Sequence, residues 1–140
     1  MSYVWQYISE EEYYCHHCGE CPPSFKSYDI EWIFEDIFTA FQRLRETWGK
    51  PIPITSGYRC PEHNVAVGGE RLSAHQFGVA LDCLFADGNE VEQAYDILMG
   101  INSDLRIGKY LDRHFIHMDN AYKIFPKASK NWLRGVHWIK

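Results

Sequence analysis

The amino-acid sequence predicts an α+β domain in which helices pack on a small antiparallel sheet. Three observations support this fold class. Apolar residues recur at helical spacing over residues 29–48. Residues 79–85 are apolar on both faces, as expected of a central strand. A second helical segment at 90–99 is followed by two strand-like segments, 106–111 and Phe115–Asp119.

The first half of the chain carries local signals for two helices and a strand. Ser9 precedes three glutamates, which predicts a short helical turn with Ser9 as the N-cap and Glu12 at the capping-box position. The 29–48 helix is expected to end near Gly49. The β-branched residues in 51–56 then predict a strand. The core face of the 29–48 helix carries Ile30, Ile33, Phe34, Ile37, Phe38, Phe41 and Leu44.

The other segments are shorter or less regular. Residues 61–67 predict a helical turn before a glycine pair, and no pattern places residues 120–140. The sequence contains no repeat, linker or low-complexity tract. We therefore expect residues 1–140 to form one domain, with an irregular N-terminal segment (1–28) and a C-terminal tail (121–140).

Bulk properties narrow the function classes. A chain of 140 residues can bury one hydrophobic core without support from disulfide bonds or structural metal ions. Its formal charge of -5 argues against non-specific nucleic-acid binding, and no apolar run is long enough to span a bilayer. The N-terminal residues lack the regions of a signal peptide, so we expect a protein that is cytoplasmic at synthesis. The oligomeric state stays open.

Two histidines and one aspartate are the main candidates for chemistry. Asp82 lies in an apolar strand, where an unpaired carboxylate is costly and needs a cation or several donors. His75 precedes it on a loop, and His117 lies on a later strand. Such a ligand set suits one catalytic Zn²⁺ per chain and leaves a fourth position for water. The alternatives are an aspartate that caps backbone N–H groups and a histidine that is only structural.

Two neighbours of these residues are expected to support them. Alternate residues of a strand share a face, so Asp119 points the same way as His117 and can orient a histidine as an outer partner. Ser73 is expected to fix the His75 loop through a hydroxyl hydrogen bond, not to act as a nucleophile.

Several motifs occur together in a specific order. They are Ile54-Thr55-Ser56-Gly57-Tyr58-Arg59-Cys60-Pro61, His63-Asn64, Gly68-Gly69, Ser73-x-His75-x-x-Gly78-x-Ala80-x-Asp82 and Phe115-Ile116-His117-Met118-Asp119. In this order the sequence resembles the zinc D-Ala-D-Ala carboxypeptidases and related muramyl-peptide endopeptidases, most of all the short single-domain members of phage and bacterial genomes. The resemblance covers about residues 13–120 and implies the Hedgehog/DD-peptidase-like zinc peptidase fold.

The resemblance also implies roles for individual residues. It implies that His75, Asp82 and His117 are the zinc ligands and that Arg59 binds a substrate carboxylate, which a guanidinium fork can hold bidentately. The alternative for Arg59 is a surface ion pair. Tyr58 is expected either to donate a hydrogen bond at the site or to pack in the core. The implied substrate is a peptidoglycan stem peptide. If the protein is phage-derived, it would act on the cell wall after its release.

The general base is the point at which this sequence departs from the family. Members with a clear base carry Glu or Asp three residues before the last ligand, where this chain has His114. Histidine can accept a proton near neutral pH, but positions 114 and 117 of one strand point to opposite faces. His114 must therefore lie in the turn before the strand if it is the base, and Asp112 is the second candidate.

The cysteines raise the question of a second metal site. Cys15, Cys18 and Cys21 are evenly spaced, and His16 or His17 could be a fourth ligand. The odd total of five cysteines fits reduced thiols better than a disulfide framework. Because no second pair of cysteines is present, the sequence favours thiols packed as small apolar groups over a metal site.

Three functional hypotheses follow. The first is a zinc metallopeptidase that hydrolyses peptide bonds of peptidoglycan, of the carboxypeptidase or the endopeptidase type, since both share these ligands. The second is a zinc-containing cell-wall-binding domain with weak or no turnover. The third is a structural domain without metal.

Overall fold

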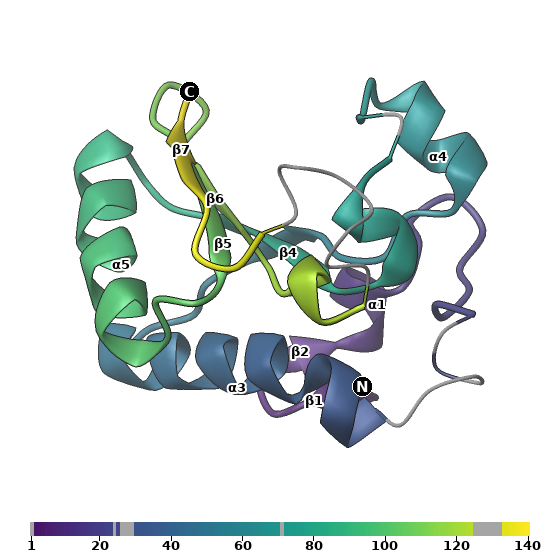
Figure 1. Ribbon diagram of the computed structural model, residues 1–140, viewed down its shortest axis with the longest axis horizontal. Coiled ribbons are helices and arrows are strands. Elements are labelled where there is room, and N and C mark those ends of the chain that lie inside the picture. Colours follow the sequence, from purple (N-terminus) through teal and green to yellow (C-terminus); the bar gives the residue numbers. More distant parts are fainter. Residues whose placement is uncertain (1, 24, 26–29, 71, 125–132) are drawn as a thin grey trace.

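A five-stranded sheet forms the centre of the molecule in the computed structural model, which describes residues 2–23, 25, 30–70, 72–124 and 133–140. Neighbouring strands are antiparallel except for the last pair, which is parallel, so the sheet is mixed. Across the sheet the order is β3 (Ile54–Ser56), β4 (Ala80–Leu84), β6 (Phe115–Asp119), β5 (Arg106–Tyr110) and β7 (His137–Ile139) (Figure 1). The α+β class is confirmed, and β4 has the predicted central position.

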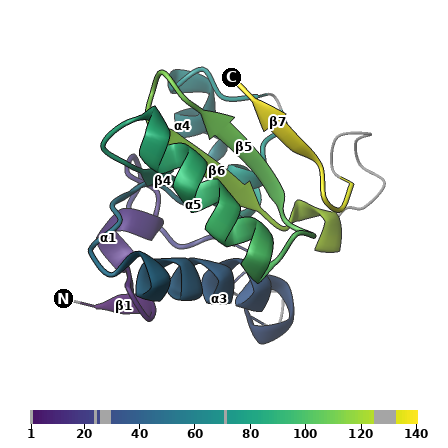
Figure 2. The same cartoon turned by 90° about the vertical axis from the view of Figure 1, so that its left-hand side faces the viewer.

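Two helices, α3 (Ile30–Trp48) and α5 (Gly88–Ile101), cover one face of this sheet (Figure 2). From Ile33 to Leu44 the apolar stripe predicted for α3 is buried, as its helical spacing requires, and the side chain of Ile30 lies outside the described part. Helix α5 starts earlier than predicted because Asp87 caps it by accepting a hydrogen bond from the Glu90 N–H. Together these two helices and the sheet enclose the apolar core.

The pleat of the strands separates core residues from candidate site residues. Leu81 and Met118 are fully buried in the core between the sheet and the helices. Asp82, His117 and Asp119 alternate with them and therefore lie on the opposite face. One face of the sheet thus stabilises the fold, and the other presents polar side chains.

The N-terminal segment is more ordered than predicted. It forms a hairpin of β1 (Tyr3–Trp5) and β2 (Ile8–Ser9), followed by α1 (Glu10–Tyr13). Ser9 caps α1 as predicted, and Glu12 accepts a hydrogen bond from the Ile54 N–H at 2.9 Å. A carboxylate therefore satisfies an N–H group of edge strand β3. Strands of two or three residues are too short to show alternation in a sequence, which explains why the hairpin was not predicted.

Short helical segments connect the strands. They are α4 (Pro61–Ala66), the 3₁₀ turn η1 (Ala74–Phe77) and a second 3₁₀ turn, η2 (Ala121–Lys123). Part of the predicted C-terminal tail, 125–132, lies outside the described residues, and strand β7 within that tail was not predicted. Among the described helices, none has the length and apolarity needed to cross a membrane.

Candidate metal centre

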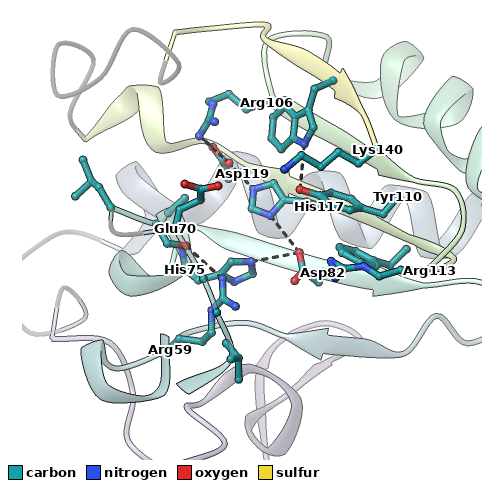
Figure 3. A pocket seen from close by; sticks show the side chains of 18 of the residues that line it. Arg59, Glu70, His75, Asp82, Arg106, Tyr110, Arg113, His117, Asp119 and Lys140 are labelled. Carbon is teal, nitrogen blue, oxygen red and sulfur yellow. Dashed lines mark hydrogen bonds and ion pairs between the residues drawn. The ribbon is translucent and has the colours of Figure 1, made fainter. Parts of the chain in front are cut away.

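The register between β4 and β6 brings Asp82 and His117 together, because the two residues are direct partners across the strands. Their nearest atoms, Asp82 Oδ1 and His117 Nδ1, are 3.1 Å apart. His75 approaches the same carboxylate oxygen from η1, with Nε2 at 3.2 Å (Figure 3). We call these three residues the triad. Its three donor atoms lie within 4.8 Å of one another, an arrangement that could hold a metal ion.

Local structure fixes the position of His75. Ser73 caps η1 by accepting a hydrogen bond from the His75 N–H at 3.2 Å, and Gln76 completes the capping box. The turn ends at Gly78 with a φ of 77°, in the left-handed region that favours glycine. A Cβ atom there would lie 2.6 Å from the Tyr13 hydroxyl oxygen. Ser73 thus makes the local hydroxyl bond that the sequence suggested.

Each imidazole of the triad has a second partner that sets its orientation. The Gly57 carbonyl lies 2.7 Å from His75 Nδ1, and it can only accept, so Nδ1 carries the proton. On the other ring, His117 Nε2 lies 2.6 Å from Asp119 Oδ2. Asp119 is fully buried and also accepts two hydrogen bonds from Arg106, at 3.0 and 3.3 Å. Such outer partners hold metal-ligating imidazoles in one tautomer.

The donor set fits a divalent cation. When the outer nitrogens of His75 and His117 carry the protons, the inner nitrogens direct lone pairs toward Asp82, which is itself an acceptor. Acceptors that converge in this way repel one another unless positive charge lies between them. Ligands about 2.0 Å from one tetrahedral zinc ion are roughly 3.3 Å apart. The observed nitrogen–oxygen separations of 3.2 and 3.1 Å match that spacing.

The electrostatics of the triad also favour positive charge. Burial opposes ionisation of Asp82, yet His75 and His117 hold the pKa of that carboxyl well below its usual range. Burial favours the neutral form of His117, but hydrogen bonds with Asp119 and Asp82 outweigh it and raise the pKa of His117 to about 9. Both pKa shifts have the same origin, because the carboxylates of the site stabilise positive charge next to them.

The triad lies in the wall of a large cavity with a volume of about 1010 Å³. Arg59, Arg113 and Lys140 contribute positive charge to the lining, and Glu70 and Asp112 contribute carboxylates. Figure 3 shows Glu70 and Arg113 on opposite sides of the triad. A cavity of this size, rich in arginine, can accept a peptide that carries carboxylates.

Arg59 is the basic residue best placed beside the triad. Its backbone N–H donates to the His75 carbonyl at 3.0 Å, and Nη2 donates to Ser73 Oγ at 3.3 Å. Its Nε is buried and has no hydrogen-bond partner among the described residues. An unpaired buried donor is costly, so this guanidinium is suited to an incoming acceptor.

The other predicted site residues lie in different surroundings. Tyr58 is buried beside Cys15 and Cys60, and it is not among the described residues that line the cavity. Burial raises the pKa of Tyr58 to about 12. Asp112 lines the cavity. His114 lies in the turn between β5 and β6, with a φ of 62°, and is not among the described lining residues.

Two contributors to the site were not identified from the sequence. Arg106 binds Asp119 because the two residues are register partners on β5 and β6, and the pattern of one strand does not reveal such pairing. Trp138, on the unpredicted strand β7, places its ring 5.5 Å from that of His117. The indole N–H donates to the Tyr110 hydroxyl at 3.1 Å. An arginine between two apolar residues, Leu105 and Ile107, was the available signal for the first of these.

A mixed sheet that presents two histidines and an aspartate to a polar cavity is the architecture of a metallohydrolase domain. The chain matches the family described as Peptidase M15 over residues 20–119, a stretch that includes the whole triad and Asp119. The chain therefore belongs to the M15 family of zinc-dependent metallopeptidases. A search of curated proteins found no match.

Proposed function

We propose that this protein uses one Zn²⁺, held by His75, Asp82 and His117, to hydrolyse peptide bonds in bacterial peptidoglycan. The observation that carries the proposal is the convergence of two oriented imidazole nitrogens and one carboxylate oxygen in the wall of a cavity. Membership of the M15 family supports the same reaction class. The substrate is a stem peptide of the D-Ala-D-Ala type.

In this proposal the triad binds the metal ion, and the residues around it orient and neutralise the ligands. Zinc bound at the triad supplies a Lewis acid that polarises a carbonyl and lowers the pKa of water to about 7. Asp119 and the Gly57 carbonyl keep the two imidazoles in the tautomers that leave the inner nitrogens free. Arg106 pairs with Asp119 and compensates the negative charge of this fully buried carboxylate.

Arg59 is proposed to hold a carboxylate of the stem peptide. Its buried and unpartnered Nε, together with its position in the cavity lining next to the triad, supports this role. A guanidinium pairs with a carboxylate through two parallel hydrogen bonds, which fixes the direction of the peptide. A terminal carboxylate bound at Arg59 would favour removal of the last residue of the stem peptide.

Asp112 is our proposed proton acceptor, in preference to His114. Asp112 lines the cavity, whereas His114 is absent from its described lining. A general base has to reach the proton that it removes, directly or through one water molecule, so position takes precedence over pKa. Tyr58 receives no direct role in this scheme, because it packs against Cys15 and Cys60.

The direct test is a digest of purified peptidoglycan and of a synthetic stem peptide that ends in D-Ala-D-Ala, analysed by mass spectrometry. We expect release of D-alanine or of cross-bridge fragments by the zinc-loaded protein and no release by the His75→Ala variant. Binding of peptidoglycan without cleavage, by zinc-loaded protein at high concentration, would refute the enzymatic proposal. That outcome would instead identify a zinc-containing cell-wall-binding domain.

A further inference from the structure

A second group of potential metal ligands lies outside the cavity. The sulfur atoms of Cys15, Cys18 and Cys60 lie within 4.8 Å of one another. Cys15 and Cys60 are buried, and Cys18 is exposed. None of the three is among the described residues that line the cavity next to the triad. Cys21, which the even sequence spacing grouped with Cys15 and Cys18, is not part of this cluster.

The backbone around Cys15 is arranged to stabilise a thiolate. The Cys60 N–H donates to Cys15 Sγ at 3.4 Å, and the N–H groups of His17 and Cys18 also point to this sulfur. Gly19, directly after the second cysteine, has a φ of 74°, so the chain turns back sharply. A Cys-x-x-Cys-Gly turn whose N–H groups surround the first sulfur presents both thiolates to one side, as a metal ion requires.

A second pair of residues with the same spacing meets this turn. Cys60 is the N-cap of α4, and the His63 N–H donates to its sulfur at 3.5 Å. The rings of His63 and His17 are parallel, with centroids 6.0 Å apart, so His63 lies next to the Cys15–Cys18 turn, although its ring nitrogens lie outside the 4.8 Å cluster of the three sulfur atoms. The purple N-terminal segment passes beside α4 in Figure 1. The sequence therefore contains Cys-x-x-Cys and Cys-x-x-His, two separated pairs of the kind that build structural zinc sites.

We propose that Cys15, Cys18, Cys60 and His63 bind a second, structural zinc ion. Three thiolates and one imidazole complete a tetrahedron, which leaves no position for substrate or water. Two of the four residues, Cys15 and Cys18, precede the stretch matched to the M15 family. The proposal does not depend on the proposed hydrolase function.

This zinc site would fasten the N-terminal segment to the loop that carries Arg59. That loop already contacts the segment, since the Tyr58 N–H donates to the Tyr13 carbonyl at 2.7 Å. A Cβ atom on Gly57 would lie 2.6 Å from the same carbonyl oxygen. Since Cys60 follows Arg59 directly, a metal bond at Cys60 would restrain the backbone next to Arg59.

The test is the zinc content of the full chain, purified in reducing buffer and measured by elemental analysis and native mass spectrometry. We expect about two zinc ions per chain in the parent protein and about one in both Cys18→Ser and His75→Ala. The double variant should bind none. Cys18 is exposed, so its replacement does not disturb the core, and circular dichroism verifies the fold of each variant.

Cobalt substitution identifies the ligands independently of catalysis. Thiolate-bound Co²⁺ has an intense near-ultraviolet charge-transfer band, which should vanish in Cys18→Ser and persist in His75→Ala. Cys21→Ser is the matched control, because Cys21 lies in the same segment but outside the cluster. His63→Ala should change the visible bands of cobalt.

Four outcomes would overturn the proposal. The first is a zinc content of one per chain that falls to zero in His75→Ala. The second and third are a cobalt spectrum that is the same in Cys18→Ser and Cys21→Ser, and visible cobalt bands that do not change in His63→Ala. The fourth is a Cys15–Cys60 disulfide in protein purified under reducing conditions.

Discussion

The triad and the cysteine cluster offer metal ligands in opposite ways. The triad combines nitrogen and oxygen donors in the wall of a cavity of about 1010 Å³, and its rings are oriented by Asp119 and a carbonyl group. The cysteine cluster offers sulfur donors that receive backbone N–H groups and lies outside the described cavity lining. The comparison teaches that solvent access and donor type, more than the number of ligands, distinguish a catalytic metal site from a structural one.

The two sites also depend on different parts of the fold. In the triad, the register of β4 and β6 places His117 opposite Asp82, so the rigid sheet sets the geometry. The cysteine cluster joins the segment after α1 to the N-terminus of α4, and its geometry depends on two connecting segments. Loss of a metal ion from the triad should therefore spare the fold, and loss of a metal ion from the cysteine cluster should loosen the N-terminal segment.

Removal of a triad ligand is the strongest way to break this comparison. In His117→Ala, only two ligands remain, and each ligand carries a large part of the binding free energy. We expect hydrolysis of the stem peptide to fall to background and the zinc at the triad to be lost, while the thiolate band of the cobalt protein persists. A variant that keeps full activity would show that the catalytic ion lies elsewhere.

Replacement of the proposed base tests chemistry without loss of metal. Asp112→Asn should lower kcat by about 10²- to 10⁴-fold, the usual contribution of general acid–base catalysis, with zinc content unchanged. His114→Ala is the matched control in the same turn and should retain most of the activity. Should His114→Ala show the larger loss in steady-state kinetics, the assignment would pass from Asp112 to His114.

Asp119→Asn examines the partner that orients His117. Outer partners of ligating histidines typically contribute 10- to 100-fold to metal affinity or activity, so we expect a loss of about that size. Competition with a zinc chelator measures the change in affinity, and thermal unfolding shows whether the contact with Arg106 has failed instead. Unchanged zinc affinity in a folded variant would contradict an orienting role.

The smallest expected effect concerns Arg59. Arg59→Lys keeps the charge but loses the planar fork, so kcat/KM for a peptide with a free terminal carboxylate should fall by about 10-fold, the equivalent of one charged hydrogen bond. The same peptide with an amidated terminus should be cleaved equally by both forms. An equal fall for both peptides would mean that Arg59 positions the His75 loop and does not bind the carboxylate.

Much of the fold could be predicted because its signals are local. The long apolar stripe of α3, the two-faced apolar run of β4 and the alternation in β6 each lie within one segment. The N-terminal hairpin and β7 could not be predicted, because strands of two or three residues show no period and form only through their partners.

The candidate sites show the same limit. The common face of His117 and Asp119 follows from alternation within one strand, but Arg106 joins them through pairing between strands. Even spacing grouped Cys21 with Cys15 and Cys18, whereas the structure brings Cys60 to them across a long stretch of chain. Neither the contact of Arg106 with Asp119 nor the approach of Cys60 to Cys15 and Cys18 can be predicted from the periodicity of one segment.

Gly108 has a consequence for the last strand of the sheet. The indole of Trp138 occupies the space that a side chain on Gly108 would fill, and the two residues are partners in the parallel pairing of β5 with β7. A strand of only three residues has little of its own to define its alignment. Because Gly108 leaves space for the indole, this contact fixes the alignment of β7 against β5. It thereby fixes the positions of Ile139 and Lys140, which line the cavity next to the triad.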